Sequence, residues 1–100
     1  MLWAITCVDN RDTAVLREQH MQVHRAYLDR QNSILVLGGA TLTDNGEQAT
    51  GSLFIINVRN RVEAAAFSAS DPFTQAGVFS SVSITRIRKS QWNPKAAENA

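Results

Sequence analysis

Residues 34–58 read ILVLGGATLTDNGEQATGSLFIINV and contain two apolar segments joined by a polar one. The apolar segments, residues 34–37 and 52–58, are rich in the aliphatic and aromatic residues that favour strands. Asn45-Gly46 in the connection is a strong hairpin signal, because tight turns need residues that tolerate positive φ. The stretch therefore predicts two antiparallel neighbouring strands, with Gly38-Gly39 marking the end of the first or a bulge in it.

Two further strands are expected at either end of the domain. Residues 2–8, LWAITCV, are an apolar run that Asp9-Asn10 ends. Residues 78–87 form the last predicted strand, in which Val78, Val82 and Ile84 alternate with other residues.

Two helices are expected between these strands. Asp12 or Thr13 can cap the first, which should run to about residue 31. Asn60 can cap a shorter second helix over residues 62–68. Ser70-Asp71-Pro72 should stop that helix, because proline disfavours helical backbone in the residue before it, and a loop over residues 71–77 is expected to follow.

The first predicted helix carries residues that are suited to chemistry. Leu16, Val23 and Tyr27 recur at helical spacing and predict its buried face. His20 and His24 fall on or beside the same face.

The order strand, helix, strand, strand, helix, strand is the split βαβ pattern of ferredoxin-like α+β folds. Two helices can cover only one face of the resulting sheet. Apolar residues nevertheless point to both faces, because Trp3, Ile5 and Cys7 alternate with Leu2, Ala4 and Val8. A second copy of the chain could bury the uncovered face, so the pattern predicts a homodimer.

Composition limits the possible functions. The 100 residues suit one domain, are 44% hydrophobic and carry a formal net charge of +1. Such a charge does not indicate nucleic-acid binding. The single cysteine, Cys7, lies in an apolar run and is expected to be a buried, inert thiol. No signal peptide or membrane span is evident, so we expect a soluble cytoplasmic protein.

Several short motifs resemble those of the YCII-related family, in the same order and at similar spacing. The most specific is the Asp-Pro-Phe segment followed by Ala-Gly. The motifs are His24-Arg25-Ala26-Tyr27-Leu28, Leu37-Gly38-Gly39-Ala40, Gly51-Ser52-Leu53-Phe54-Ile55, Ala69-Ser70-Asp71-Pro72-Phe73 and Ala76-Gly77-Val78-Phe79. The resemblance implies one domain over residues 1–88, followed by a polar tail over residues 89–100.

The resemblance also implies a ferredoxin-like βαββαβ domain that forms a dimeric α+β barrel, with a cleft lined by a His–Asp pair. In this chain the pair would be His24 and Asp71. Family members commonly carry an arginine upstream of the helix histidine; here His20 lies near that position and Arg17 lies further back. Members also often end the last strand in Pro-Trp, where this chain has Ile87-Arg88-Lys89.

Taken singly, His24 and Asp71 have ordinary structural explanations. An Asp before a proline often caps a turn, and a helix histidine often bonds to a carbonyl or to water. As a pair they would have a chemical use. An Asp that accepts from one imidazole nitrogen fixes the tautomer and makes the other nitrogen a better base.

Other residues around the expected cleft are candidates for substrate binding. His20 and Arg17 share the helix with His24, and the Tyr27 hydroxyl could donate to a bound phenolate, although a core role suits this residue better. Phe73 is expected to pack the loop onto the sheet or to form a pocket wall. Ser80 follows the Asp71 loop and could be an ordinary polar residue of the strand face.

A metal site is a minor alternative. His20 and His24 are four residues apart, so they share a helical face, and Asp71 could supply a third ligand. The helix lacks the glutamate of the H-E-x-x-H motif, and the prediction is no metal and no cofactor.

Together these observations predict a small-molecule lyase with cofactor-independent acid–base chemistry. By resemblance, the substrate would be a hydroxylated aromatic or quinone-like compound, and the reaction could be dehydrochlorination of a chlorinated hydroxyquinol in aromatic catabolism. Isomerisation of a lactone or enol needs the same positioned base. A third possibility is a module that binds a small metabolite without turnover, because a fold alone does not fix function.

Overall fold

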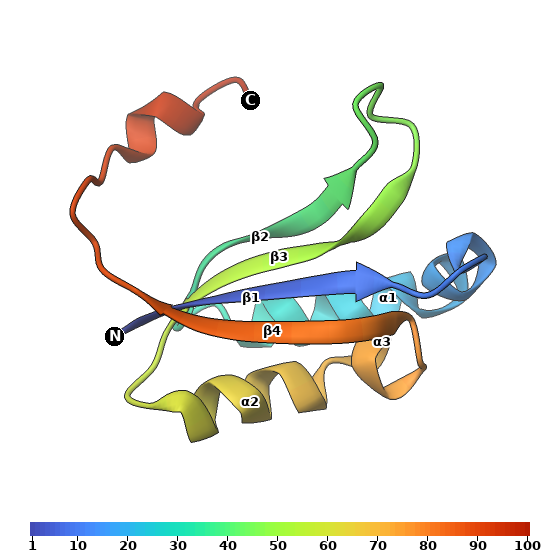
Figure 1. The fold of residues 1–100 in the computed structure, drawn as a ribbon, viewed down its shortest axis with the longest axis horizontal. Coiled ribbons are helices and arrows are strands. Elements are labelled where there is room, and N and C mark those ends of the chain that lie inside the picture. The colour runs from blue at the N-terminus through green and yellow to red at the C-terminus, as the bar shows by residue number, and fades with distance from the viewer.

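A computed structural model describes residues 1–100 and has one four-stranded sheet with its helices on one side (Figure 1). The elements follow the order β1 (Leu2–Asp9), α1 (Ala14–Arg30), β2 (Leu35–Leu42), β3 (Ala49–Asn57), α2 (Arg61–Ser70), α3 (Pro72–Gln75) and β4 (Phe79–Ile87). The sheet order is β2-β3-β1-β4 and every neighbouring pair is antiparallel. The predicted ferredoxin-like α+β fold is confirmed.

The β2–β3 hairpin is longer than predicted. β2 does not end at Gly38-Gly39 but continues to Leu42, with irregular pairing between Leu35 and Leu37. Gly38 is needed inside the strand, because a Cβ atom there would lie 2.9 Å from the Phe54 ring. Gly46 has φ +74° in the connection, which agrees with the predicted tight turn.

The hydrophobic core lies between the sheet and the helices. Trp3, Ile5 and Cys7 of β1 share one face, as the alternation predicted, and this face is the one buried against the helices. The complete core cluster is Trp3, Ile5, Cys7, Tyr27, Phe54, Ile56, Ala64 and Phe67. Burial of each large side chain contributes about 1.5–3 kcal/mol to folding, so this cluster is the main source of stability.

The opposite face of the sheet carries no helix. On it, Val8 is 50% exposed and Leu37 is 58% exposed, while Leu53 and Ile55 of β3 are half-buried. We refer to this surface as the open face. Its apolar content agrees with the alternation in the sequence.

The buried face of α1 differs from the prediction. Val23 is 53% exposed and Leu16 is only partly buried, so Tyr27 alone of the three predicted residues is buried. The buried residues of α1 are instead Arg17, His24 and Tyr27. The helix therefore directs a basic side chain, an imidazole and a phenol into the protein.

The segment after α2 also differs from the prediction. Asn60 caps α2 by accepting a hydrogen bond from the Glu63 backbone N–H at 2.9 Å, as expected. Residues 71–77, however, contain the one-turn helix α3 rather than only a loop. Asp71 has extended backbone (φ −66°, ψ 126°), because proline follows it, and it is the N-cap of the new helix.

The last strand begins one residue later than predicted and ends at Ile87, as predicted. β4 begins at Phe79, so the fully buried Val78 precedes it, and Val82 is 37% exposed. Residues 88–100 are exposed and form only local backbone hydrogen bonds, including those of a short 3-10 turn at Pro94–Ala97. Figure 1 shows this segment leading away from the sheet. None of the helices has the length and apolar character that crossing a membrane requires.

Candidate active site

His24 and Asp71 meet in the interior between α1 and α3. His24 Nδ1 lies 2.7 Å from Asp71 Oδ1, and their side chains are only 9% and 2% exposed. The same carboxylate oxygen accepts a hydrogen bond from the Phe73 backbone N–H at 2.9 Å. Asp71 therefore has two roles at once, as cap of α3 and as partner of the imidazole.

The hydrogen-bond pattern defines which nitrogen of His24 is available. A carboxylate is an acceptor only, so Nδ1 must carry the proton that bonds to Asp71. In the neutral imidazole Nε2 is then the acceptor. Nε2 makes no hydrogen bond within the protein and is not among the fully enclosed polar atoms without a partner. The arrangement leaves a basic nitrogen for a ligand.

Two polar side-chain atoms, one in this pair and one close to it in sequence, are buried without partners. They are Asp71 Oδ2 and Thr74 Oγ1, the only side-chain atoms of this kind in the protein. Buried polar groups are normally hydrogen-bonded, since leaving one unpaired costs about 1–3 kcal/mol. The orphaned atoms both belong to the first turn of α3, so the His24–Asp71 region is incompletely satisfied.

The Phe73 ring covers one face of the His24 imidazole. Its ring stacks on His24 with centroids 3.8 Å apart and an angle of 5° between the planes. The ring is 1% exposed. The sequence placed Phe73 at the loop but did not reveal this stacking, because the two residues are brought together only by the packing of α3 on α1.

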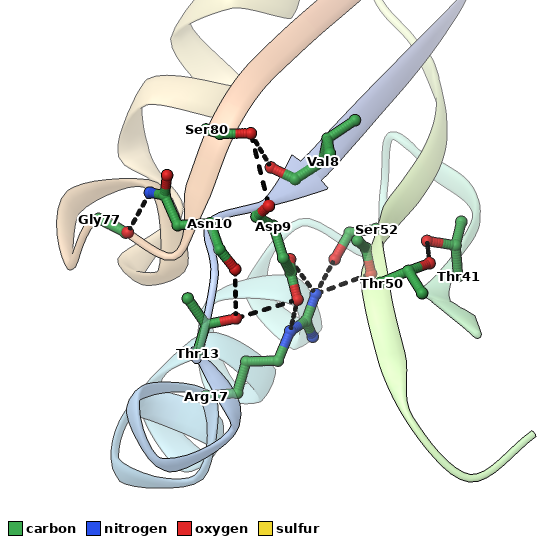
Figure 2. Close-up of polar contacts among 11 residues, drawn as sticks. Val8, Asp9, Asn10, Thr13, Arg17, Thr41, Thr50, Ser52, Gly77 and Ser80 are labelled. Carbon is green, nitrogen blue, oxygen red and sulfur yellow. Dashed lines mark hydrogen bonds and ion pairs between the residues drawn. The ribbon is translucent and has the colours of Figure 1, made fainter. Parts of the chain in front are cut away.

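A second buried ion pair lies further along α1. Arg17 Nε donates to Asp9 Oδ2 at 2.7 Å and Nη2 donates to Asp9 Oδ1 at 2.9 Å, and Thr13 Oγ1 adds a longer contact to Oδ2. Nη2 also donates to the Gly51 carbonyl at 2.7 Å and to Ser52 Oγ at 3.2 Å. Figure 2 shows Arg17 reaching from α1 to the end of β1 and to β3.

Most of the Arg17 guanidinium is therefore engaged within the protein. Only Nη1 has no hydrogen-bond partner, so a ligand would have a single nitrogen to approach. Asp9 and Ser52 were not among the candidate residues. The position of Asp9 at a predicted strand end gave no sign that its partner would be eight residues away on the helix.

The remaining candidates have different environments. The Tyr27 hydroxyl donates to the Phe67 carbonyl at 2.8 Å, and Ser80 Oγ contacts the carbonyl oxygens of Val8 and Asp9. Both hydroxyls are thus directed at backbone atoms. His20 is half-buried and makes no hydrogen bond.

No three His, Cys, Asp or Glu side chains converge in the geometry of a metal site.

Burial controls the ionisation of two groups near the pair. Burial raises the pKa of Cys7 to about 12, and the Asp71 and Asp9 carboxylates act in the same direction against a smaller opposing effect of Arg17. Burial also raises the pKa of Tyr27, with a further contribution from Asp71. Neither group is suited to act as a base, which agrees with the prediction of an inert thiol.

The largest cavity does not surround the His–Asp pair. It measures about 510 Å³ and lies between the β1–α1 turn and the β2–β3 connection, where Arg17 forms part of the wall. Its lining is mostly polar and consists of Asp9, Asn10, Asp12, Thr13, Ala14, Arg17 and residues 47–50. The lining contains no histidine or lysine, so no imidazole or amine base faces this cavity.

The solved structures that resemble this chain include a dehydrochlorinase. The 5-chloro-2-hydroxyhydroquinone dehydrochlorinase TftG of Burkholderia phenoliruptrix AC1100, in complex with 2,5-dihydroxybenzoquinone, has a TM-score of 0.81 and 29% identity. The alignment covers 88% of this chain and 94% of TftG.

A second solved structure is less similar to this chain. At3g17210 of Arabidopsis thaliana has 10% identity over 92% of this chain and 97% of its own, with a TM-score of 0.48, which carries no functional information. None of the curated proteins matches this sequence significantly.

The YCII-related domain profile matches residues 1–88. The chain is a member of the YCII-related family.

Proposed function

We propose that this protein is a small-molecule lyase in which His24 Nε2 is the general base and Asp71 orients the imidazole. The observation that carries this proposal is the buried contact of 2.7 Å between His24 Nδ1 and Asp71 Oδ1, combined with an Nε2 that has no protein partner. An oriented imidazole of this kind typically contributes about 10²- to 10⁴-fold to a proton-transfer step.

The proposed substrate is a hydroxylated aromatic ring, with dehydrochlorination of a chlorinated hydroxyquinol as the specific reaction. TftG supports this assignment, since its overall structure is similar and its name describes a dehydrochlorinase. The apolar ring of Phe73 and the neighbouring Phe54 provide a dry environment around His24. A dry site strengthens the electrostatic interactions of the base with a phenolate.

The chemical steps balance without a cofactor. Nε2 takes a proton from a ring hydroxyl and returns it to the carbon that carries chlorine, so the ring tautomerises and that carbon becomes saturated. Nε2 then takes the proton of a second hydroxyl, the electron pair of the O–H bond forms a carbonyl, and the C–Cl bond breaks as chloride leaves. The net products are a hydroxyquinone, chloride and one proton.

Isomerisation of a lactone or enol remains the second candidate function. It would use the first half of the same sequence, in which Nε2 moves one proton from oxygen to carbon. The availability of a single base without a second acidic group in contact with Nε2 favours reactions of this simple type.

We also propose that the open face is buried in a homodimer. The exposed Val8 and Leu37 lie on one side of a sheet whose other side is covered by helices. A closed twofold contact between two such faces would remove the apolar surface from water.

Chloride release and quinone formation test the enzymatic proposal. Chlorinated and unchlorinated hydroxyquinols would be followed anaerobically by ultraviolet–visible spectroscopy and a chloride electrode, with wild type beside His24→Ala and Asp71→Asn. We expect rapid chloride release by wild type only. Absence of acceleration over buffer would eliminate dehydrochlorination of these substrates and favour isomerisation or binding alone.

A further inference from the structure

Phe73 contacts the imidazole of His24 more closely than any other aromatic ring. The two rings are nearly parallel, with centroids 3.8 Å apart, whereas Phe54 is tilted at 6.3 Å. A single hydrogen bond from Nδ1 to Asp71 restrains the plane of the imidazole only loosely, because the χ2 torsion of histidine has a broad energy minimum and a hydrogen bond tolerates some misalignment. A flat neighbour on the ring face restricts rotation about χ2.

A second side chain of α1 also lies over the Phe73 ring. The Arg17 guanidinium carbon lies 5.0 Å from the Phe73 centroid. Arg17 and His24 are seven residues apart on α1, which corresponds to about 10 Å along the helix axis. The Phe73 ring therefore fills the space between two side chains of one helix face, and Asp9 holds Arg17 in place through two hydrogen bonds.

The backbone connects this stack to the His–Asp pair. The Phe73 N–H donates to the same Asp71 oxygen that faces His24, and Pro72 fixes the geometry between them. The segment Asp71-Pro72-Phe73 thus supplies a carboxylate to the edge of the imidazole and a phenyl ring to its face.

We propose that Phe73 is a positioning residue that holds the plane of the His24 imidazole, and so the direction of Nε2, through the stack of Arg17, Phe73 and His24. The role is distinct from that of a pocket wall, because Phe73 acts through His24 rather than by contact with substrate. This inference rests on the proposed role of His24 as base.

The test compares two buried phenylalanines. Phe73→Leu removes the flat face and keeps an apolar side chain. Phe67→Leu is the matched control, because Phe67 is 4% exposed and packs on Tyr27 and Phe54 in the core cluster. Phe73→Met is a second variant with a longer side chain, for use where the Leu variant does not fold.

The first measurement is independent of turnover. The chain has two histidines, so ¹⁵N-histidine labelling with a His20→Gln variant assigns the His24 signals. Wild type and Phe67→Leu should show one tautomer with the proton on Nδ1. Phe73→Leu should show averaged ring nitrogen shifts and faster exchange of the Nδ1 proton.

The second measurement separates kcat from KM in the chloride-release assay. We expect Phe73→Leu to lower kcat about 10- to 100-fold with KM changed less than about twofold, and Phe67→Leu to keep kcat within about threefold. Wild-type His24 signals and kcat in Phe73→Leu would overturn the inference, as would equal losses in Phe67→Leu. If His24→Ala keeps full activity, the proposed function fails, while the spectra still decide whether Phe73 orders the ring.

Discussion

Helix α1 contributes to two buried acid–base pairs that differ in how completely they are satisfied. In the Asp9–Arg17 pair both carboxylate oxygens accept from the guanidinium, which also bonds to β3. In the His24–Asp71 pair one carboxylate oxygen and one imidazole nitrogen have no protein partner. The comparison indicates that the first pair is structural, whereas the second keeps unused hydrogen-bonding capacity, of which the proposed function assigns His24 Nε2 to a substrate.

Arg17→Met should cause the largest loss of stability. Methionine keeps an apolar stem near Phe73 but leaves the Asp9 carboxylate buried without its cation, which typically costs about 3–5 kcal/mol. Urea unfolding followed by circular dichroism measures this. Arg59→Met is the control, because Arg59 pairs with Glu63 at the exposed surface and its loss should hardly shift the urea midpoint. Equal shifts in the two variants would contradict a structural role for Asp9–Arg17.

Asp71→Asn should cost much less stability than Asp9→Asn. Asparagine keeps one oxygen that can accept from His24 Nδ1 and the Phe73 N–H, and the replaced Oδ2 has no partner to lose. We expect a cost of about 1 kcal/mol. At Asp9 both oxygens bond to Arg17, so the expected cost is about 3 kcal/mol. Urea unfolding of both variants measures the two costs. A larger loss of stability in Asp71→Asn than in Asp9→Asn would show that the number of hydrogen bonds made by each carboxylate does not set its contribution to stability.

Thr74→Val should be neutral or slightly stabilising. Its hydroxyl is buried without a partner, so an apolar replacement of the same shape removes an unsatisfied group and should change stability by less than about 1 kcal/mol. Thr13→Val is the matched control beside the satisfied pair, where the hydroxyl contacts Asp9 and the Asn10 carbonyl. Thermal unfolding of both variants gives the comparison. A clear loss in Thr74→Val alone would mean that a water or ligand bonds to this hydroxyl.

Ionisation of Cys7 should leave stability at neutral pH unchanged and should act only at alkaline pH. The pKa of its thiol is raised from 9.0 to about 12 in the fold, so between these values the unfolded chain loses this proton and the folded chain keeps it. Stability from this group is therefore complete below about pH 9 and is lost progressively toward pH 12. Urea titrations of wild type and Cys7→Ala across this range should show a shallower decline in the variant. Identical slopes would contradict the raised pKa.

The sequence predicted the parts of the fold that depend on local rules. The Asn60 cap, the turn at Gly46 and the break before Pro72 follow from the preferences of single residues and their neighbours. The alternation in β1 correctly grouped Trp3, Ile5 and Cys7 on one face, but it did not say whether that face or the opposite one would be covered by the helices. Element order then led to the ferredoxin-like topology.

The buried face of α1 could not be predicted in the same way. Apolar spacing selected Val23, which is exposed, over Arg17, which is buried. Burial of an arginine is tolerated here because Asp9 and the Gly51 carbonyl accept hydrogen bonds from it across the fold, and helical periodicity contains no information about such partners.

The candidate site, like the fold, could be predicted from the sequence only in part. His24 and Asp71 were selected by family resemblance, and the structure brings them into contact although they are 47 residues apart. The stacking of Phe73 and the orphaned oxygen of Asp71 follow from how α3 packs on α1, which no local pattern encodes.

The most direct test of the account is the rate of chloride release by His24→Gln with a chlorinated hydroxyquinol. Glutamine can still donate a hydrogen bond to Asp71, so the fold should be retained, but it cannot accept a proton from a substrate at neutral pH. We predict a loss of at least about 100-fold in kcat relative to wild type. A folded His24→Gln variant that releases chloride at the wild-type rate would contradict the assignment of His24 as the base.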